Sequence, residues 1–173
     1  MKRLILPDDA SAKASIIEIG RRMYDKNYCA ANDGNISCKT EEGCYWVTPS
    51  GVSKGFLTED MLIKDGNVLE AGGDYKISSE IQLHMTVYKN REDVNAVVHA
   101  HPPASTAFAC ARKPMDIPVV NEAYLNLGEV LCAPFAAPGT RELAESIIPY
   151  LKGHAAVLLA NHGAVVWGSD IIN

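Results

Sequence analysis

The sequence predicts an α/β protein built as a single domain, with a central mixed, largely antiparallel sheet flanked by helices. Its 173 residues are enough for one packed core and too few for two ordinary domains. Hydrophobic residues make up 47% of the chain and recur from end to end, without a repeat or a linker-like stretch. Helical and strand-like segments mix without regular strand–helix–strand alternation, which favours antiparallel pairing.

The first part of the chain predicts one helix followed by two hairpins. Asp8 or Asp9 can cap a helix that ends near residue 27. Its apolar residues recur at helical spacing: Ile16, Ile19 and Met23. Short runs of β-prone residues then alternate with turn residues, which is typical of hairpins. The predicted arms are 36–38 with 45–48, and 62–64 with 67–69.

The middle of the chain predicts a helix, a strand and a second helix. Ser79 and Gln82 have the spacing of a capping box, so we expect a helix over residues 80–90. Residues 94–101 are typical of a buried strand, which two consecutive prolines stop. A short helix then runs to about Cys110.

The last part of the chain predicts one more helix and two strands. Thr140 is placed to cap this helix, and Gly153 is placed to end it. The apolar side chains of the helix are Leu143, Ile147 and Leu151. Residues 155–160 and 164–167 are apolar runs of strand length, and they complete the predicted sheet.

Charge and patterning exclude several classes of protein. Sixteen Lys and Arg against 21 Asp and Glu give a net charge of −5 without a dense basic cluster, which argues against a nucleic-acid partner. No apolar run reaches the roughly 18 residues of a membrane span, and the N-terminus lacks the apolar core of a signal peptide. Five cysteines without a Cys-x-x-Cys pair favour reduced thiols. We therefore expect a cytoplasmic protein with no membrane partner.

Three histidines are placed to bind one metal ion. His99 and His101 lie two residues apart in a predicted strand, so their imidazoles point to the same face. Alone this pair is more often structural, but His162, in a turn after another apolar strand, offers a third ligand. Three imidazoles leave one coordination position open, as in a catalytic zinc site. His84 suits a packed helix position and His154 a helix end or the surface, so neither is assigned to the metal.

Three turns are candidates for binding an anion such as a phosphate group. Ser78 and Ser79 lie at a predicted helix start, where unpaired backbone N–H groups and the helix dipole favour an anion. Two further turns present glycine backbone beside short polar side chains: Gly34-Asn35 and Ser50-Gly51. Each turn taken alone is more typical of an ordinary cap or chain reversal.

Seven short motifs follow one another along the chain. They are Gly34-Asn35-Ile36-Ser37, Thr48-Pro49-Ser50-Gly51, Ser78-Ser79-Glu80, His84, His99-x-His101, Gly139-Thr140 and Asn161-His162-Gly163. In this order and spacing they resemble the class II aldolase/adducin family, over nearly the whole chain. Within the family the sequence looks most similar to the zinc-dependent L-fuculose-1-phosphate aldolases.

The resemblance implies a zinc-dependent aldolase that cleaves a ketose 1-phosphate into dihydroxyacetone phosphate and an aldehyde. His99, His101 and His162 match the metal ligands, and Glu80 matches the general acid/base. The positions that match the phosphate site are Gly34, Asn35, Ser50, Gly51, Ser78 and Ser79. Zinc, or another divalent metal, would stabilise the enediolate formed in this retro-aldol cleavage. Family members are typically homotetramers with active sites between subunits, so we expect a homo-oligomer.

Two features depart from the family pattern. Glu122 stands where the family has a tyrosine that donates a proton to the aldehyde oxygen, with Tyr124 two residues further on. The identity of the aldehyde, and therefore of the sugar, is left open. The chain also ends at Asn173, before the C-terminal helical segment that is usual in the family. We expect residues 1–173 to be a class II aldolase/adducin domain that lacks this segment.

Two other functions share much of this pattern. An L-ribulose-5-phosphate 4-epimerase-like enzyme would use the same metal and the same cleavage, but those relatives carry Asp at the position of Glu80. A non-catalytic, adducin-like assembly module would not need the three histidines or Glu80, so their presence favours an enzyme. A dehydratase or decarboxylase relative is also left open.

Overall fold

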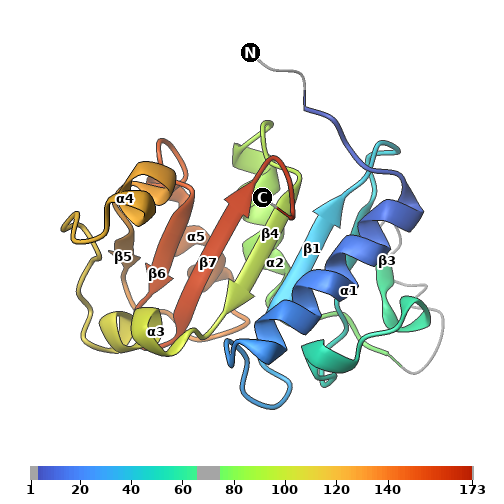
Figure 1. The fold of residues 1–173 in the computed structure, drawn as a ribbon, viewed down its shortest axis with the longest axis horizontal. Coiled ribbons are helices and arrows are strands. Elements are labelled where there is room, and N and C mark those ends of the chain that lie inside the picture. Colours follow the sequence, from blue (N-terminus) through green and yellow to red (C-terminus); the bar gives the residue numbers. More distant parts are fainter. Residues whose placement is uncertain (1–3, 66–74, 173) are drawn as a thin grey trace.

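One central sheet organises the chain and confirms the predicted fold class (Figure 1). The computed structural model describes residues 4–65 and 75–172. Within these residues seven strands lie in the order β3-β2-β1-β4-β7-β6-β5. Their bounds are β1 (Asn35–Lys39), β2 (Tyr45–Val47), β3 (Ile63–Asp65), β4 (Ala96–Ala100), β5 (Leu131–Ala133), β6 (Ala156–Leu159) and β7 (Gly163–Gly168). Neighbouring strands are antiparallel except β5 and β6, so the sheet is mixed and largely antiparallel.

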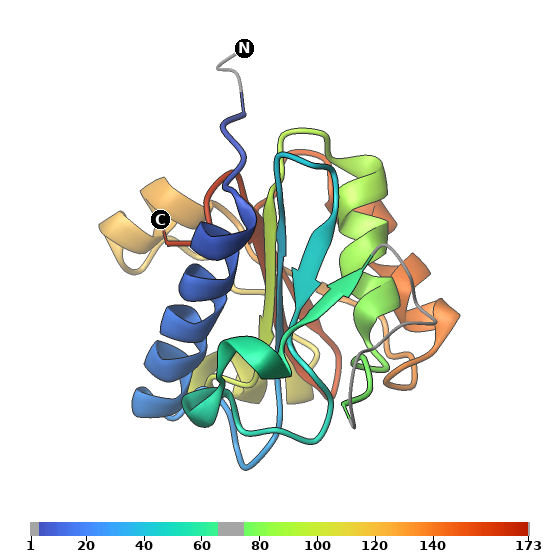
Figure 2. The same ribbon diagram turned by 90° about the vertical axis from the view of Figure 1, so that its right-hand side faces the viewer.

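Helices cover both faces of the sheet, which Figure 2 shows edge-on. The α-helices are α1 (Asp9–Asp25), α2 (Ile81–Asn90), α3 (Pro103–Cys110), α4 (Asn121–Leu127) and α5 (Arg141–Ser146). Short 3-10 helices are η1 (Lys54–Phe56), η2 (Glu59–Met61) and η3 (Ile148–Tyr150). Helices α2 and α5 lie on one face, and α1, α3 and α4 lie on the other. No helix in the described part of the chain is long and apolar enough to cross a membrane.

The N-terminal helix α1 forms where the sequence predicts it. Asp8 is the N-cap, and its Oδ1 accepts the N–H of Ser11 at 2.7 Å. The helix ends at Asp25, two residues before the predicted end. Ile16 and Met23 are buried in an apolar cluster with side chains of β1, so the helical spacing correctly identified the buried face.

Strand β1 separates an apolar layer from a polar one. Ile36 and Cys38 are fully buried in the cluster that α1 covers. Asn35 and Ser37 point to the other face of the sheet, where both contact His84 of α2. This arrangement follows from the alternation of side chains along a strand. The α2 side of β1 is therefore where polar chemistry can be built.

A second apolar cluster packs α2 and α5 against the sheet. Its fully or nearly fully buried members are Leu83, Val87, Val97, Leu143, Ile147, Leu151, Val157, Leu159, Val165 and Trp167. They include all three apolar side chains predicted for the Thr140 helix. Buried area of this kind is the main stabilising contribution to a domain of this size. This cluster thus fixes helix α2, which carries His84, on the sheet.

The predicted capping box at the start of α2 is wrong. Helix α2 begins at Ile81 with Glu80 as its N-cap residue, and no side chain caps it. Ser78 lies two residues before Glu80, and its Oγ accepts the N–H of Glu80 at 3.3 Å. The chain is still in a turn at Ser79, so this serine precedes the N-cap position and cannot serve it. This turn places the Glu80 side chain at the junction of loop and helix.

The predicted end of the fifth helix is also wrong. Thr140 caps α5 as expected, with its Oγ1 accepting the N–H of Leu143 at 3.3 Å. The α-helical part stops at Ser146, however, and a 3-10 turn follows before Gly153. Pro149 has no N–H with which to extend the α-helical ladder, which explains the early end.

The hairpin predictions have mixed outcomes. Strands β1 and β2 pair antiparallel with Cys38 opposite Trp46, which confirms the first hairpin. The first arm of the second hairpin forms β3, which pairs with β2, whereas the arm at 67–69 lies outside the described residues. Strands β4, β6 and β7 and helix α3 form where they are predicted. Helix α4 and strand β5 were not predicted.

Candidate active site

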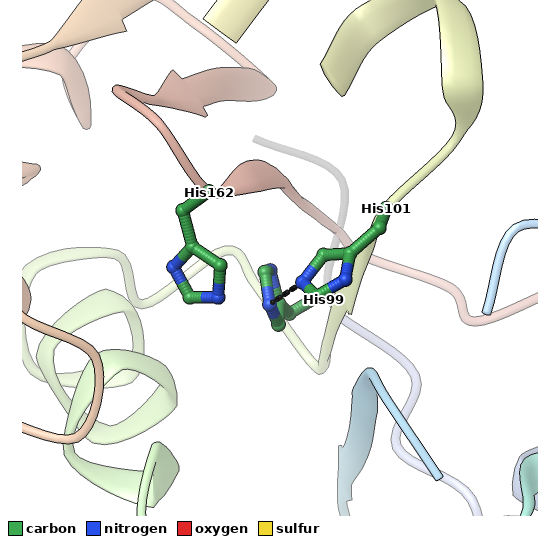
Figure 3. Close-up of side chains that lie close together, drawn as sticks. All are labelled: His99, His101 and His162. Carbon is green, nitrogen blue, oxygen red and sulfur yellow. Dashed lines mark hydrogen bonds between the residues drawn. The ribbon is translucent and has the colours of Figure 1, made fainter. Parts of the chain in front are cut away.

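Three histidines converge at one end of the sheet, as the sequence predicts (Figure 3). His99 lies in β4, His101 directly follows this strand, and His162 lies in the turn between β6 and β7. Strands β4 and β7 pair with Ala100 opposite Ala164, which brings the histidine segments side by side. One ligand nitrogen from each ring lies within 4.8 Å of the other two. This cluster is the candidate metal centre.

Two glycines allow the histidines to pack this closely. A Cβ atom at Gly163 would lie 2.5 Å from Cδ2 of His101. A Cβ atom at Gly34 would lie 2.8 Å from the carbonyl oxygen of His99, and Gly34 also has a φ of +78°. Both glycines belong to the motifs identified in the sequence. Their role seen here is to make room for the histidine segments.

The hydrogen bonds of His99 leave a nitrogen lone pair inside the cluster. Its Nδ1 lies 2.9 Å from the carbonyl oxygen of Ala164, which can only accept, so Nδ1 carries the proton. Burial, followed by the neighbouring His162 and His101, lowers the pKa of His99 to about 3, so the ring is neutral. The lone pair on Nε2 therefore points toward the other donors of the site.

Further donor atoms face this lone pair. Nε2 of His101 lies 3.1 Å from Nε2 of His99, and Oε2 of Glu80 lies 3.3 Å from the same atom. Nδ1 of His101 lies 3.4 Å from Oδ2 of Asp33, which favours a proton on Nδ1 and a second lone pair on Nε2. Lone pairs at these distances repel one another unless a cation lies between them. The residues therefore fit a bound cation.

The spacing of these nitrogens suits a small divalent ion. Zinc binds imidazole at roughly 2.0–2.1 Å in tetrahedral geometry, so two ligand nitrogens are expected about 3.3 Å apart. The His99–His101 separation of 3.1 Å is close to this value. Neutral imidazole is also the protonation state that binds a metal. The donor set suits zinc and several other divalent metals.

Glu80 lies beside two of the three imidazoles, those of His99 and His162. Only 10% of its side chain is exposed. Its Oε2 accepts a hydrogen bond from Nδ2 of Asn35 at 2.8 Å. Its Oε1 lies 3.4 Å from Nε2 of His162, and it is a buried atom without a hydrogen-bond partner. Burial lowers the pKa of His162, and the nearby Glu80 opposes this shift. A carboxylate with one free oxygen in this position is suited to transferring a proton.

A second group of polar residues is linked to Glu80 by hydrogen bonds on the α2 face of the sheet. His84 is fully buried, as expected for a packed helix residue, and its Nε2 lies 2.6 Å from Oδ1 of Asn35. Its Nδ1 lies 2.7 Å from Oγ of Ser37. Sequence reasoning gave His84 only a packing role. His84 lies four residues after Glu80, a spacing that places both side chains on one face of a helix. This spacing would have indicated that the two residues belong to the same site.

The residues predicted to bind phosphate lie around Glu80. An isolated β-bridge between Pro49 and Ile77 brings the Ser50-Gly51 turn beside Ser78. The N–H of Ser50 is bonded to the carbonyl oxygen of Lys76 at 2.8 Å, which fixes this turn. Ser79 is exposed, and Ser78 is buried with its Oγ on the N–H of Glu80. Phosphate binding by these residues stays a prediction.

The Asn35 side chain is more constrained by hydrogen bonds than the side chains of Ser50, Ser78 and Ser79. The Asn35 amide uses its oxygen for His84 and one of its hydrogens for Glu80. One amide hydrogen is left over for a ligand. Gly139, from another motif of the sequence, has a φ of +73°, and a Cβ atom there would lie 3.2 Å from Cβ of Ser79. The structure thus brings all the predicted phosphate-binding segments to the same end of the molecule as Glu80.

The two candidates for the remaining proton donor lie elsewhere. Glu122 and Tyr124 are on helix α4, and both are exposed. In Figure 1, α4 lies at the opposite end of the strands from the point where β4 ends and β7 begins. Within one chain these side chains are therefore not part of the histidine cluster.

Comparisons with known proteins find similar sequences and a similar fold. The family model "Class II Aldolase and Adducin N-terminal domain" matches residues 14–173. An L-fuculose phosphate aldolase of Methanococcus maripaludis is 35% identical over 158 residues, which are 90% of this chain and 83% of the relative. A 3-oxo-tetronate 4-phosphate decarboxylase of Haemophilus influenzae is 33% identical over 172 residues, with coverage of 95% and 80%. A solved structure of an L-fuculose 1-phosphate aldolase matches with a TM-score of 0.85 and 29% identity, covering 96% of this chain and 79% of that one.

These matches identify the class of protein to which the site belongs. The family model spans more than half of the chain, so the chain belongs to the class II aldolase and adducin family. Its histidine cluster and its similarity to curated lyases make it an enzyme of the aldehyde-lyase type, a class II aldolase. Fold alone would not distinguish an enzyme from an assembly module, whereas the site does.

Proposed function

We propose that this protein is a zinc-dependent aldolase that cleaves a ketose 1-phosphate, of the L-fuculose 1-phosphate type, into dihydroxyacetone phosphate and an aldehyde. The observation that carries the proposal is Glu80, whose Oε1 makes no hydrogen bond and lies 3.4 Å from His162, one of three converging imidazoles. Family membership and the aldolase of Methanococcus maripaludis support the reaction class. The decarboxylase relative leaves the substrate to experiment.

His99, His101 and His162 are the proposed metal ligands. A divalent ion at this position would supply a Lewis acid for the carbonyl oxygen of the substrate. Because neutral imidazoles carry no charge, these ligands leave the positive charge of the site available to the substrate. His99 is held in its orientation by the carbonyl oxygen of Ala164, and His101 faces the carboxylate of Asp33. Such outer contacts fix the ligand rings and their tautomers.

Glu80 is the proposed general acid/base. When the C3–C4 bond of the ketose breaks, the electron pair of this bond stays on C3 and the C4 hydroxyl loses its proton as the aldehyde forms. We assign the return of a proton to C3 to Oε1 of Glu80, since this oxygen is buried and makes no hydrogen bond. For the proton of the C4 hydroxyl we propose Glu122 or Tyr124 of a neighbouring subunit.

The phosphate group is proposed to bind beside Glu80. Backbone and hydroxyl groups of the two serine turns, together with Gly34 and Asn35, offer hydrogen bonds to its oxygens. Binding the phosphate away from the reacting carbons provides energy that holds those carbons at the catalytic groups. The proposed phosphate site consists of backbone N–H groups and hydroxyls. Local hydrogen bonds of this kind can bind an anion although the whole chain has a net charge of −5.

We also propose that the protein is a homo-oligomer, namely a tetramer with active sites between subunits. Large apolar side chains around helix α4 are exposed: Ile117 by 74%, Val119 by 84% and Leu125 by 82%. Exposed apolar residues grouped in this way are typical of interaction surfaces. Light scattering is expected to give about four times the chain mass of 18.7 kDa. A monomer at micromolar concentration would contradict the proposal.

A cytoplasmic location is proposed on the basis of the cysteines. All five are free thiols. Cys29 and Cys38 are buried, where oxidation would disrupt packing. Reduced cysteines are typical of proteins in a reducing compartment.

The experiment is a substrate panel on protein loaded with zinc. Ketose 1-phosphates are incubated with the protein, and dihydroxyacetone phosphate is measured with a coupled reductase while bound zinc is counted. The expected result is one zinc per chain and product from at least one substrate. Full zinc occupancy without dihydroxyacetone phosphate from any member of the panel would contradict the proposal. L-Ribulose 5-phosphate in the same panel tests for an epimerase.

Decarboxylation of a phosphorylated 3-oxo acid is the second candidate. It is favoured by the relative of Haemophilus influenzae, which covers 95% of this chain. Loss of carbon dioxide beside a carbonyl group leaves the same kind of electron pair on carbon, so the same metal ligands and Glu80 would serve. Release of carbon dioxide from a 3-oxo-tetronate 4-phosphate, without aldolase activity, would select this candidate.

A further inference from the structure

A buried chain of hydrogen bonds runs from Tyr88 to Glu80. Tyr88 OH lies 2.8 Å from Ser37 Oγ, which lies 2.7 Å from Nδ1 of His84. Nε2 of His84 lies 2.6 Å from Oδ1 of Asn35, and Nδ2 of Asn35 lies 2.8 Å from Oε2 of Glu80. Ser37 and His84 have no exposed surface, and Asn35 and Tyr88 are buried as well. Water is therefore kept away from most of this chain.

The carboxylate at one end gives every hydrogen bond in this chain one direction. An ionised carboxylate can only accept, so the NH₂ group of Asn35 donates to Glu80 and its carbonyl oxygen faces His84. His84 must then donate from Nε2, which leaves Nδ1 of the neutral ring as an acceptor for the Ser37 hydroxyl. The hydroxyl of Tyr88 is the donor that remains for Ser37 Oγ, which at 2.8 Å is nearer than its other acceptor, the carbonyl oxygen of Asn95 at 3.4 Å. All the donors point toward Glu80.

This direction matters because it distinguishes the two carboxylate oxygens of Glu80. Oε2 is occupied by the Asn35 amide, whereas Oε1 is buried without a hydrogen-bond partner and lies 3.4 Å from His162 Nε2. If His84 could not donate, the Asn35 amide would lose the bond that fixes its orientation. A rotated amide would present its oxygen to the Glu80 carboxylate and repel it.

We propose that His84 is a positioning residue for proton transfer at Glu80. Acting through Asn35, it holds Oε2 of Glu80 and leaves Oε1 as the oxygen that exchanges a proton with the substrate carbon. His84 itself does not touch the substrate. This inference rests on the proposed function, since it concerns the proton step of the same site.

The test isolates the proton step from cleavage of the carbon–carbon bond. Dihydroxyacetone phosphate is incubated with zinc-loaded protein in deuterium oxide, and NMR follows the hydroxymethyl carbon. There Oε1 takes a proton as the C–H bond breaks, and deuterium returns to the same carbon. Wild type is expected to exchange one of the two protons. His84→Phe, which keeps a planar ring but cannot donate, is expected to slow exchange by about 10- to 100-fold with a nearly unchanged KM.

Two variants separate positioning from a loss of packing. His84→Gln offers an N–H donor near the same position, so it is expected to recover part of the exchange rate. Val87→Ala removes buried volume from the same helix on its apolar side. It is expected to lower the midpoint of thermal unfolding while leaving the exchange rate within about twofold of wild type. Bound zinc is measured for each variant and is expected to stay at one per chain.

A measurement on wild type keeps the inference testable if His84→Phe does not fold. In protein labelled with nitrogen-15 histidine, NMR is expected to show His84 protonated on Nε2 and unprotonated on Nδ1. The opposite tautomer would overturn the inference. So would exchange at the wild-type rate by folded, zinc-loaded His84→Phe. If wild type neither exchanges nor cleaves any substrate, the proposed function fails, and the inference fails with it.

Discussion

The two faces of strand β1 show how one short segment serves stability and chemistry at once. On the α1 face, Ile36 and Cys38 are fully buried among apolar side chains. On the α2 face, Asn35 and Ser37 are equally buried but bond to Glu80 and His84. The backbone is the same and the burial is the same. What differs is whether each buried atom needs a partner.

This difference has an energetic meaning. Burying an apolar side chain is favourable by itself, whereas a buried polar group costs free energy unless every hydrogen bond is made. The α1 face therefore stabilises the fold, and the α2 face depends on a complete set of partners. Changes on the α1 face are expected to affect folding, and changes on the α2 face to affect catalysis. Substitutions on each face test this separation.

The largest effect is expected for Glu80→Gln. Glutamine keeps the size of the side chain but cannot carry a proton, so kcat for the release of dihydroxyacetone phosphate should fall by about 10²- to 10⁴-fold. The melting temperature should change little. Glu59→Gln, at an exposed position of η2, is the matched control and should retain full activity. Activity of Glu80→Gln near that of wild type would remove Glu80 from the mechanism.

On the α1 face, Ile36→Ala is expected to lower the free energy of unfolding by about 2–5 kcal/mol. Ile36 has no exposed surface, and its loss leaves a cavity under α1. Urea denaturation measures this change, and kcat of the folded protein should stay within about twofold of wild type. A large loss of kcat with unchanged stability would show that the two faces are not separate.

A matched pair of neighbours compares the faces directly. Ser37→Ala removes the donor to Nδ1 of His84, so kcat should fall by roughly threefold to tenfold. Cys38→Ala removes one buried sulfur from the other face, so it should reduce stability by about 1 kcal/mol without changing kcat. Steady-state kinetics of both variants measure kcat, and urea denaturation measures the free energy of unfolding. Equal effects of the two substitutions on kcat would contradict the separate roles of the two faces.

The smallest effect concerns the chemical reactivity of the α1 face. Burial raises the pKa of the Cys38 thiol to about 12. A raised pKa means less thiolate at a given pH, so at pH 8 only about one Cys38 thiol in 10,000 is ionised. Cys110 is exposed and should react with iodoacetamide first, as mass spectrometry of the labelled peptides can show. Labelling of Cys38 at the rate of Cys110 would mean that the layer under α1 opens readily.

Much of the fold and the convergence of the three histidines could be predicted from the sequence. Alternation and helical spacing correctly gave β1, β4 and α1, and the His99-x-His101 spacing with His162 gave the cluster that the structure brings together. Helix α4 was missed because its exposed apolar residues do not follow the spacing of a helix that packs on the core. An apolar stripe marks only those helices that bury one face.

The parts of the site that could not be predicted depend on contacts between distant segments. Glu80 and Asn35 are 45 residues apart in sequence, and neither suggests the other until α2 packs on β1. Ser79 was expected to cap the helix, but the turn that aims Glu80 at the histidines shifts the helix start past it. Local sequence rules fail here because the tertiary position of the carboxylate determines the local structure.

A crystal structure of the zinc-loaded protein, with anomalous data collected at the zinc edge, would test the proposed metal site most directly. We expect one peak per chain, at roughly 2.0–2.1 Å from one nitrogen of each of His99, His101 and His162. Oε1 of Glu80 should face the same position, with Oε2 still on the Asn35 amide. A peak bound by other residues, or no peak at the histidines in fully zinc-loaded crystals, would contradict the proposed metal site.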